Sequence, residues 1–454
     1  MKLLETGAKI LFSRVGQVLA NAAVVLFVAK TLGPEGQGHY SLTVAVTMLL
    51  AALLGGGMGL AAVPPLRQNR VPAGRMLAAQ MVWALVMAAL LLAAAWITTG
   101  GRAVQFLHEF LGWQRGLGFV AAIAATAILA FEIFSYDLLA RGRLVVSAAV
   151  NGGRAVGHLL LVLILAVTST LSLGWAVGAL TIAHTCGSLI MLAVLLREVR
   201  SPSNGVPTAT ETGSTPTINA GTAPPGAAAG ADGMNSADIP ADLAERSLGG
   251  LILFNLRRGW LGQISAVAYF LLLRLDQGIL AHFRGAAEVG IYSVAAYVGE
   301  MLWLLPGALT PLLIHSSAAD ATDTRRDSTA SRAARLGFLL TLAAGLPLFF
   351  LAKPLLSLLA GGEYAASGDS LRALLPGIVA FAPGAVLAGD FIGRGKPHWN
   401  TQASALTVLV NVAVGLVLIP RHGAVGAAWA SSIAYACGSM VMLLRFRQAT
   451  RRSS

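Results

Sequence analysis

The sequence predicts an all-α polytopic membrane protein in which two six-helix bundles follow one another in the chain. Three observations predict this fold class: the composition, twelve long apolar segments, and a pattern that occurs twice. Of the 454 residues, 56% are hydrophobic and 11% are charged, and the mean hydropathy is +0.72. The charged fraction is about half that of an ordinary soluble domain, and so much apolar surface excludes a water-soluble fold.

Twelve apolar segments are long enough to cross a bilayer, since a helix needs about 20 residues to span the hydrocarbon. An open sheet is excluded because unpaired backbone groups cannot be left in lipid. The segments cover residues 9–31, 39–62, 75–98, 116–139, 148–168 and 173–196, and then 259–282, 288–314, 333–352, 370–393, 402–420 and 424–444.

The two halves share the pattern Gly-x-x-x-x-Gly-x-Tyr-Ser, which begins at Gly33 and again at Gly285. Similarity at so long a period indicates two copies of a whole domain. Each copy has an even number of spans, so the copies are parallel repeats with one orientation, as in transporters whose site lies between the halves. Two further correspondences support the duplication: Asp137 with Arg141 recurs as Asp390 with Arg394, and Ile182 with Cys186 recurs as Ile433 with Cys437.

The 32 Lys and Arg residues predict the orientation. With the N-terminus in the cytoplasm, 23 of them lie at inner segment ends and 7 at outer ends, which leaves Arg14 and Arg274 inside the membrane. The positive-inside rule therefore places both termini in the cytoplasm. This distribution accounts for most of the net charge of +12, so no nucleic-acid partner is expected.

Residues 198–247 are rich in Pro, Thr, Gly, Ser and Ala and have few large apolar side chains. Such a stretch cannot bury enough surface to offset its ordering entropy. We expect a disordered cytoplasmic linker between an N-terminal lobe, residues 1–197, and a C-terminal lobe, residues 248–454. Residues 248–258 are apolar and end in two arginines, which predicts a short helix at the inner interface.

No catalytic or metal-binding motif is found, so we expect neither an enzyme nor a cofactor. The candidate functional residues are instead ionisable side chains inside the bilayer. Each costs about 2.5–3.5 kcal/mol to insert, so those present usually face a cavity or a partner. They are Arg14, Glu132, Arg274, Asp276 and Glu300, with Lys30 near the outer mouth.

Two interpretations of these charges stay open, a transport cavity and buried pairs that hold helices together. Arg274 and Asp276 lie about 200° apart around a helix, so they cannot simply neutralise each other. Glu300 in the next span is a candidate partner for Arg274. Arg14 lies about 8 Å from the inner edge and could instead extend its charge to the interface.

Several other residues have a structural interpretation beside a functional one. Asp137 with Arg141 and Asp390 with Arg394 form either local helix-end pairs or the two halves of a cytoplasmic gate. The glycines of residues 55–59 favour close helix approach or bending. The motif tyrosines are expected in an outer aromatic belt, and lone histidines are expected to be packed or interfacial. These are Tyr40 and Tyr292, and His158, His184 and His315.

Residues 32–42, Leu-Gly-Pro-Glu-Gly-Gln-Gly-His-Tyr-Ser-Leu, resemble the turn after the first span of Wzx-type oligosaccharide flippases. Residues 275–280 and 287–295 are similar to the seventh span and following turn of that family, which belongs to the multidrug/oligosaccharidyl-lipid/polysaccharide exporter superfamily. The resemblance implies a MATE-like, V-shaped pair of bundles around a cationic cavity. It also implies a bacterial inner-membrane protein that moves undecaprenyl-pyrophosphate-linked oligosaccharides by alternating access, for cell-surface polysaccharide biosynthesis.

The cavity implied in this way would bind the lipid-linked glycan with Arg274, Arg14 and Lys30. Asp276 or Glu300 could bind a coupling H+ or Na+, and undirected flipping pulled by downstream polymerisation is an equal alternative. Membrane lipids and a polysaccharide polymerase or another envelope-synthesis protein are the expected partners. Two alternatives remain: an ion-coupled drug or metabolite antiporter, which an acidic cavity would favour, and a non-transporting scaffold for envelope synthesis, which would depend on the linker.

Overall fold

The computed structural model describes residues 2–97, 117–200, 239–319, 323–396 and 398–451, and within them all regular structure is helical. The N-terminal lobe comprises α1 (Lys2–Gly55), α2 (Met58–Arg67), α3 (Ala73–Ile97), α5 (Leu117–Ala140), α6 (Leu144–Val167) and α7 (Leu173–Arg200). Then follow η2 (Ala241–Ala244), α9 (Leu248–Arg284), α10 (Ala286–Glu300), η3 (Met301–Trp303), α11 (Leu304–Ala319), α12 (Asp323–Ala360), η4 (Gly362–Ala366), α13 (Ser367–Gly393) and α14 (His398–Arg451).

The predicted twelve-span fold is confirmed for the described residues. Ten helical segments are long and apolar enough to cross a membrane, and α1 and α14 each hold two spans. Each pair is separated at a glycine, Gly33 with φ 69° and Gly423 with φ 56°, which a residue with a Cβ adopts only under strain. The chain is thus a multi-pass membrane protein.

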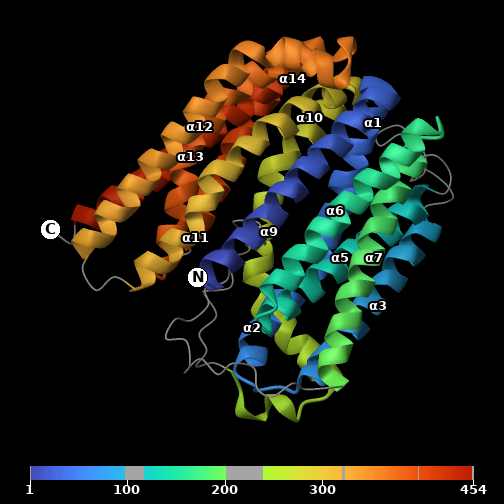
Figure 1. Cartoon of the computed structure of the whole chain (residues 1–454), viewed down its shortest axis with the longest axis vertical. Helices are drawn as coiled ribbons and strands as arrows, with labels where there is room; N and C mark the ends of the chain where they lie inside the picture. The colour runs from blue at the N-terminus through green and yellow to red at the C-terminus, as the bar shows by residue number, and fades with distance from the viewer. Residues whose placement is uncertain (1, 98–116, 201–238, 320–322, 397, 452–454) are drawn as a thin grey trace.

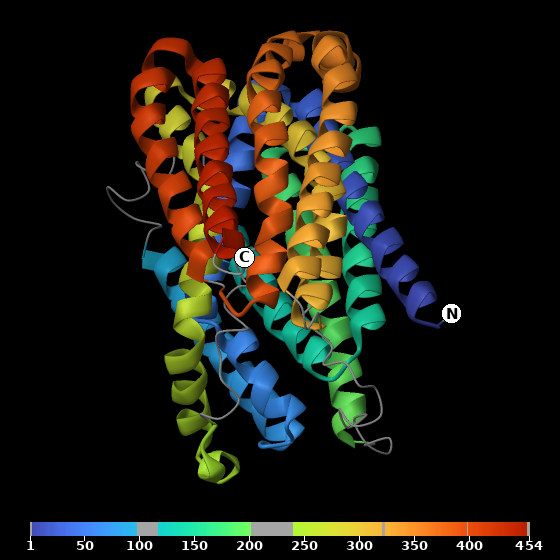
Figure 2. The same ribbon diagram turned by 90° about the vertical axis from the view of Figure 1, so that its left-hand side faces the viewer.

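The two lobes converge where α1 and α10 run side by side (Figure 1). On the far side of the C-terminal lobe, α13 lies between α12 and the second half of α14 (Figure 2). Near the convergence, residues of α1 belong to the core of the C-terminal lobe: Val25, Ala29 and Leu42 pack in one cluster with Val289 and Tyr292. The lobes are therefore closed against each other at this end, the outer end in the predicted orientation.

The first glycine of the repeated motif makes the turn between spans. Gly33 and Gly285 both have a left-handed φ with extended ψ, at 69° and −179° and at 84° and 177°. This backbone region is almost restricted to glycine.

The second glycine of the motif makes the contact between the lobes. A Cβ on Gly38 would collide with the carbonyl oxygen of Ala286, and a Cβ on Gly290 would collide with that of Pro34. Because these four positions are equivalent in pairs, the contact lies on the pseudo-two-fold axis of the duplication. Beside it, the Ser41 hydroxyl donates to Gln277 Oε1 at 2.9 Å, and Gln37 Nε2 donates to Ser293 Oγ at 3.3 Å.

The prediction of an aromatic belt at Tyr40 and Tyr292 is wrong, because both side chains are buried, at 4% and 1% exposure. Tyr40 packs in the core of the N-terminal lobe with Val28 and Val162, whereas Tyr292 packs in the core that α1 shares with the C-terminal lobe. Tyr292 donates its hydroxyl hydrogen to Asp276.

The prediction of a separate interfacial helix over residues 248–258 is also wrong, because α9 is continuous from Leu248 to Arg284. Its first half packs on the N-terminal lobe, where Leu251 and Phe254 share a core with Met76. Its second half packs in the C-terminal lobe, so α9 bridges the two. Of the predicted linker, residues 201–238 lie outside the described part of the chain, whereas Ile239 and Leu243 pack in that same core.

The glycines of residues 55–59 both bend the chain and allow close approach, as expected. Gly56 and Gly57 have φ values of +54° and +72°, and α2 begins directly after them. A Cβ on Gly57 would collide with the backbone of Gly259 in α9. Gln263 of α9 accepts the Gly57 backbone N–H at 3.0 Å and donates to the carbonyl of Ala52, which fixes the bend.

Candidate functional site

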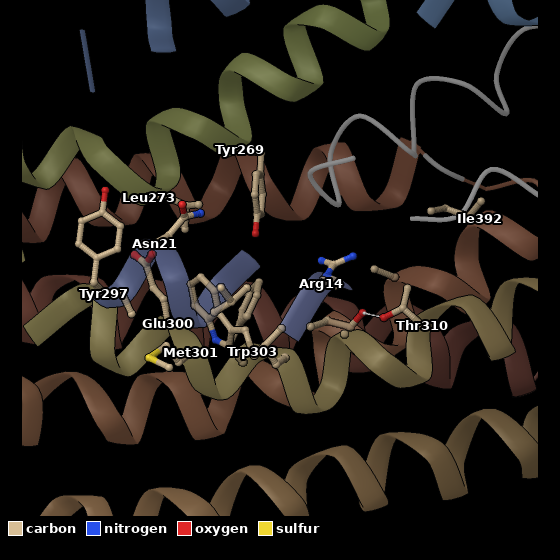
Figure 3. A pocket seen from close by; sticks show the side chains of 17 residues that line it. Arg14, Asn21, Tyr269, Leu273, Tyr297, Glu300, Met301, Trp303, Thr310 and Ile392 are labelled. Atoms are coloured by element: carbon tan, nitrogen blue, oxygen red, sulfur yellow. Dashed lines mark hydrogen bonds between the residues drawn. The ribbon is translucent and has the colours of Figure 1, made fainter. Parts of the chain in front are cut away.

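A cavity of about 310 Å³ lies between the lobes, enclosed by α1, α9, α10, α11, α13 and η3 (Figure 3). The polar and aromatic side chains of its wall are Arg14, Asn21, Tyr269, Tyr297, Glu300, Trp303, Thr310 and Phe381. Both lobes contribute, because Arg14 and Asn21 belong to α1 and the others to the C-terminal half. The site lies where a transporter with parallel repeats would hold its cargo.

Arg274 and Glu300 form the ion pair that the sequence predicts. Two guanidinium nitrogens donate to the two carboxylate oxygens at 2.7 and 3.0 Å, and both side chains are largely buried. The Arg274 guanidinium also lies 4.8 Å from the centre of the Tyr297 ring. Glu300 and Tyr297 line the cavity, whereas Arg274 lies behind them. The charge of Glu300 is therefore neutralised from within the protein.

Arg14 is the cation that faces the cavity without compensation. Its Nη1 atom is buried and has no hydrogen-bond partner among the described residues. Figure 3 shows its guanidinium reaching into the space toward which Tyr269 also points. A buried charge without a partner is costly, so this group favours an anionic ligand.

An aromatic wall lines the C-terminal side of the cavity. Trp303 lies 5.5 Å from Phe381 and 5.4 Å from Tyr435 between ring centres. The indole Nε1 of Trp303 is buried and, within the described part of the chain, makes no hydrogen bond. Such a wall offers apolar ring faces together with a free donor, a combination that suits polar molecules with apolar faces.

A second cavity, of about 290 Å³, lies on the N-terminal side, between α1, α2, α5, α6, α7 and α9. The Arg154 guanidinium reaches it, and its Nη1 lies 3.1 Å from His184 Nε2. His184 Nδ1 lies 2.9 Å from the carbonyl of Leu180, so we assign its hydrogen to Nδ1 and leave Nε2 to accept from Arg154. Glu132 lines the same cavity.

Arg154 is a site residue that the sequence does not predict, because it belongs to the 23 charges assigned to inner segment ends. Since α6 begins at Leu144, Arg154 lies about 15 Å along the helix. The corrected count is 22 inner and 7 outer charges, with three arginines inside the membrane. The available signal was that Arg154 falls within the predicted span 148–168. His184 is packed, as expected, and so is His158, while the His315 side chain lies outside the described set.

Asp276 lies in a buried polar cluster and outside the lining of both cavities. Its Oδ2 accepts from the Tyr292 hydroxyl and from Ser431 Oγ at 2.8 Å, and its Oδ1 accepts from the Gln277 backbone N–H at 2.8 Å. Asn411 Nδ2 donates to Ser431 at 3.0 Å. The carboxylate is thus held by neutral donors while Arg274 is engaged by Glu300.

The remaining predicted residues lie at the helix ends. Lys30 is exposed on α1 and does not line the central cavity. In the N-terminal lobe Arg141 donates to Asp137 at 3.1 Å and lies 3.8 Å from Glu198. The local helix-end pair is therefore present, and a gate role for it remains a prediction.

The equivalent cluster in the C-terminal lobe has the same arrangement of an arginine between two carboxylates. Arg394 donates to Asp390 and to Asp327, both at 2.6 Å. Burial lowers the pKa of the Arg394 guanidinium, but its hydrogen bonds with the two carboxylates outweigh this effect and raise the pKa. Gly142 and Gly395 follow the two arginines with φ values of +73° and +68° and end the two helices alike.

Metal ligation finds no support in the described residues, where no three His, Cys, Asp or Glu side chains are grouped so that they could hold an ion.

No protein-family model and no curated protein matches the sequence. Solved structures match it over nearly the whole chain. An inward-facing multidrug resistance MATE family transporter of the MOP superfamily has a TM-score of 0.70 and 16% identity, with 96% of this chain and 95% of that chain covered. The lipid II flippase MurJ, in an inward closed conformation, has a TM-score of 0.70 and 13% identity, with coverages of 99% and 90%.

A third match is a MOP superfamily transporter from Pyrococcus furiosus whose binding pocket is described as reversed in polarity. Its TM-score is 0.63 at 16% identity, with 99% of this chain and 95% of that chain covered. At these identities the likeness shows the fold. The predicted MATE-like architecture of twelve helices is confirmed.

Proposed function

We propose that the chain is a flippase that moves an undecaprenyl-pyrophosphate-linked oligosaccharide from the inner to the outer leaflet of the bacterial inner membrane, for cell-surface polysaccharide biosynthesis. One observation carries the proposal: Arg14 enters a cavity between the lobes with a buried, unpartnered guanidinium nitrogen. A pyrophosphate would replace lost water with charge-assisted hydrogen bonds there. Its lipid chain can remain in the bilayer while the headgroup crosses.

The charge balance of the cavities supports an anionic cargo. Arg14 and Arg154 face the two cavities, whereas the charge of Glu300 is neutralised by Arg274, which leaves Glu132 as the opposing acid among the described lining residues. The aromatic wall at Trp303 fits the glycan part, because sugar rings present apolar C–H faces together with hydroxyl acceptors.

An antiporter would have the same fold, so the fold cannot decide between a flippase and an antiporter. The transporter from Pyrococcus furiosus is described as having a pocket of reversed polarity on the same architecture. The distinction therefore depends on the charge in the pocket. An excess of arginine disfavours a cationic drug, which would be repelled by Arg14.

We further propose that Asp276 binds the ion that couples transport, H+ or Na+. Its carboxylate is almost fully buried between α10, α14 and the second half of α9, the helix that bridges the two lobes. The Asn411 Oδ1 atom nearby is buried and unpartnered among the described residues. Asp276→Asn should abolish the dependence of transport on whichever gradient drives it, and imposing the pH and Na+ gradients separately tells the two ions apart.

Flipping in proteoliposomes tests the proposed function, with a fluorescent undecaprenyl-pyrophosphate-linked oligosaccharide as substrate. Arg14→Gln should lower the rate about 10- to 100-fold, the worth of a charged hydrogen bond of 1.5–3 kcal/mol. Arg14→Lys should retain part of the rate. Lys30→Gln is the matched control, because it also removes one positive charge from α1 but outside the cavity, and it should leave the rate unchanged.

Three results would contradict the proposal in different ways. Wild-type flipping by Arg14→Gln would remove the cavity assignment. Movement of an organic cation such as ethidium without movement of the lipid would indicate the antiporter. Failure of glycan export on deletion of residues 201–238, with no effect of Arg14→Gln, would indicate the scaffold.

A further inference from the structure

We propose that a groove on the outer face of the C-terminal lobe binds an anionic phospholipid. The groove has a volume of about 700 Å³ and lies over α13 between α12 and the second half of α14. The groove lies at the same end of the lobe as the C-terminus, which is the level of the inner leaflet in the predicted orientation. Two arginines, Arg335 and Arg447, line it together with Ser331, Phe338 and Leu443.

The groove opens away from the transport cavity. On α13, Phe381, Ala385 and Ala388 line the central cavity, whereas Pro383 and Leu387 line the groove. Residues two positions apart on a helix lie about 200° apart, so the two sets occupy opposite faces of α13. Figure 2 shows this side of the lobe, with α13 between its two neighbours. The groove therefore faces the surrounding lipid, and its occupant is distinct from the proposed cargo.

The lining changes from polar to apolar along both flanking helices, and in the same direction. On α12 it runs from Asp327 and Ser331 at the inner end to Phe338 deeper in the membrane. On α14, which runs the opposite way, it passes from Leu443 to Arg447. A phospholipid has this order of chemistry, with a charged headgroup at the interface and acyl chains toward the bilayer centre.

The positive charge of the groove is available to a ligand. Arg335 and Arg447 are exposed, and neither has an ion-pair partner among the described residues. The acidic residue of the groove, Asp327, is already held by Arg394 at 2.6 Å, and Arg394 also holds Asp390. Basic pockets between helices at the inner face are suited to anionic headgroups.

Native mass spectrometry of the full chain in detergent tests this site, with phosphatidylglycerol and phosphatidylcholine of equal acyl length as probes. The wild type should retain phosphatidylglycerol preferentially. Each arginine should contribute about fivefold, so Arg335→Gln with Arg447→Gln should weaken binding about 25-fold. The matched control, Arg332→Gln with Arg445→Gln, removes the same charge from the same two helices outside the groove and should bind as the wild type does.

A second variant tests the shape of the site without changing its charge. Ser331→Trp places a large ring at the polar end of the groove and should also reduce retention of phosphatidylglycerol. Equal binding by the groove variant and its control would overturn the proposal, since the attraction would then be a general effect of basic residues. Displacement of the lipid by millimolar inorganic phosphate would overturn it too, because the site would then recognise a free anion.

Discussion

The contact between Gly38 and Gly290 predicts that a single methyl group at either position disfavours closure of the outer end. A Cβ on Gly38 would lie far inside the van der Waals radius of the Ala286 carbonyl oxygen, and one on Gly290 would do the same to Pro34. The obstacles are backbone atoms, which cannot turn aside as a side chain can. The two helices must therefore separate by about 1 Å or more.

The expected magnitude follows from the cost of overpacking, about 1–3 kcal/mol. In a two-state equilibrium between an outer-closed and an outer-open form, this corresponds to a shift of about 5- to 150-fold toward the open form. Gly38→Ala and Gly290→Ala should each produce it. They should also slow flipping, because alternating access needs both states.

Spin-label distances between the outer ends of the two lobes provide the assay. The labels are placed at Ser172→Cys and Arg421→Cys, both exposed, after replacement of the native Cys186 and Cys437. Either glycine variant should populate a longer distance than the parent. Gly157→Ala is the control, since nothing lies within 4 Å of its added Cβ and alanine favours a helix over glycine. Parent-like distances in both Gly38→Ala and Gly290→Ala would refute the reasoning.

Three further perturbations test the interior. Arg274→Met should lower the free energy of unfolding by about 3–5 kcal/mol, because it leaves Glu300 buried and unpaired. The double variant Arg274→Met with Glu300→Met should regain most of this loss. An equal loss in the double variant would contradict the pairing. Arg154→Gln should weaken binding of the pyrophosphate-linked glycan in a titration by about tenfold or more, while His184→Gln, which keeps an acceptor, should change it less. Gln263→Ala should lower the free energy of unfolding by about 1–3 kcal/mol, because it removes both hydrogen bonds at the bend. An unchanged melting temperature would show that the bend is fixed by its glycines alone.

The spans and their duplication could be predicted because each depends on a signal within the chain itself. The length of an apolar run decides whether a helix can cross the bilayer, and the repeated glycines mark equivalent turns whatever their surroundings. The Arg274–Glu300 pair could also be predicted, because a buried charge requires a partner and the next span offered one.

The errors share a different cause, since they depend on what packs against a segment. The apolar rhythm of residues 248–258 is equally suited to a membrane surface and to the core that Leu251 shares with Met76. From the sequence, the position of Tyr292 near a helix end predicts a residue of the aromatic belt. In the structure the contact between the lobes buries it. Arg154 and His184 meet only through the register of α6 against α7, which no local pattern specifies.

The residues that recur in both lobes and the residues that do not recur have different roles. At an offset of 252, the equivalents of Arg14, Arg274, Asp276 and Glu300 are Ala266, Ala22, Val24 and Met48, so none of these charges is duplicated. The duplicated residues instead make turns, helix ends and the glycine contact, features that both lobes need in order to move as equivalent bodies.

Under the proposed function, this division lets one symmetric frame hold an asymmetric cargo. A pyrophosphate with a glycan on one side and a lipid on the other presents different chemistry to each lobe, so a symmetric set of ligands would leave half of its buried charges unpaired. The charges lie where the repeats diverge, with Arg14 and Arg154 in the N-terminal lobe and the Arg274–Glu300 pair in the other. It follows that transferring a charge to its equivalent position, as in Arg14→Ala with Ala266→Arg, should preserve the net charge but not transport. Ala266 lines the second cavity, so this variant moves one positive charge from the central cavity to the other. Flipping at the wild-type rate would show that the total charge of the two cavities, and not its placement, recognises the cargo.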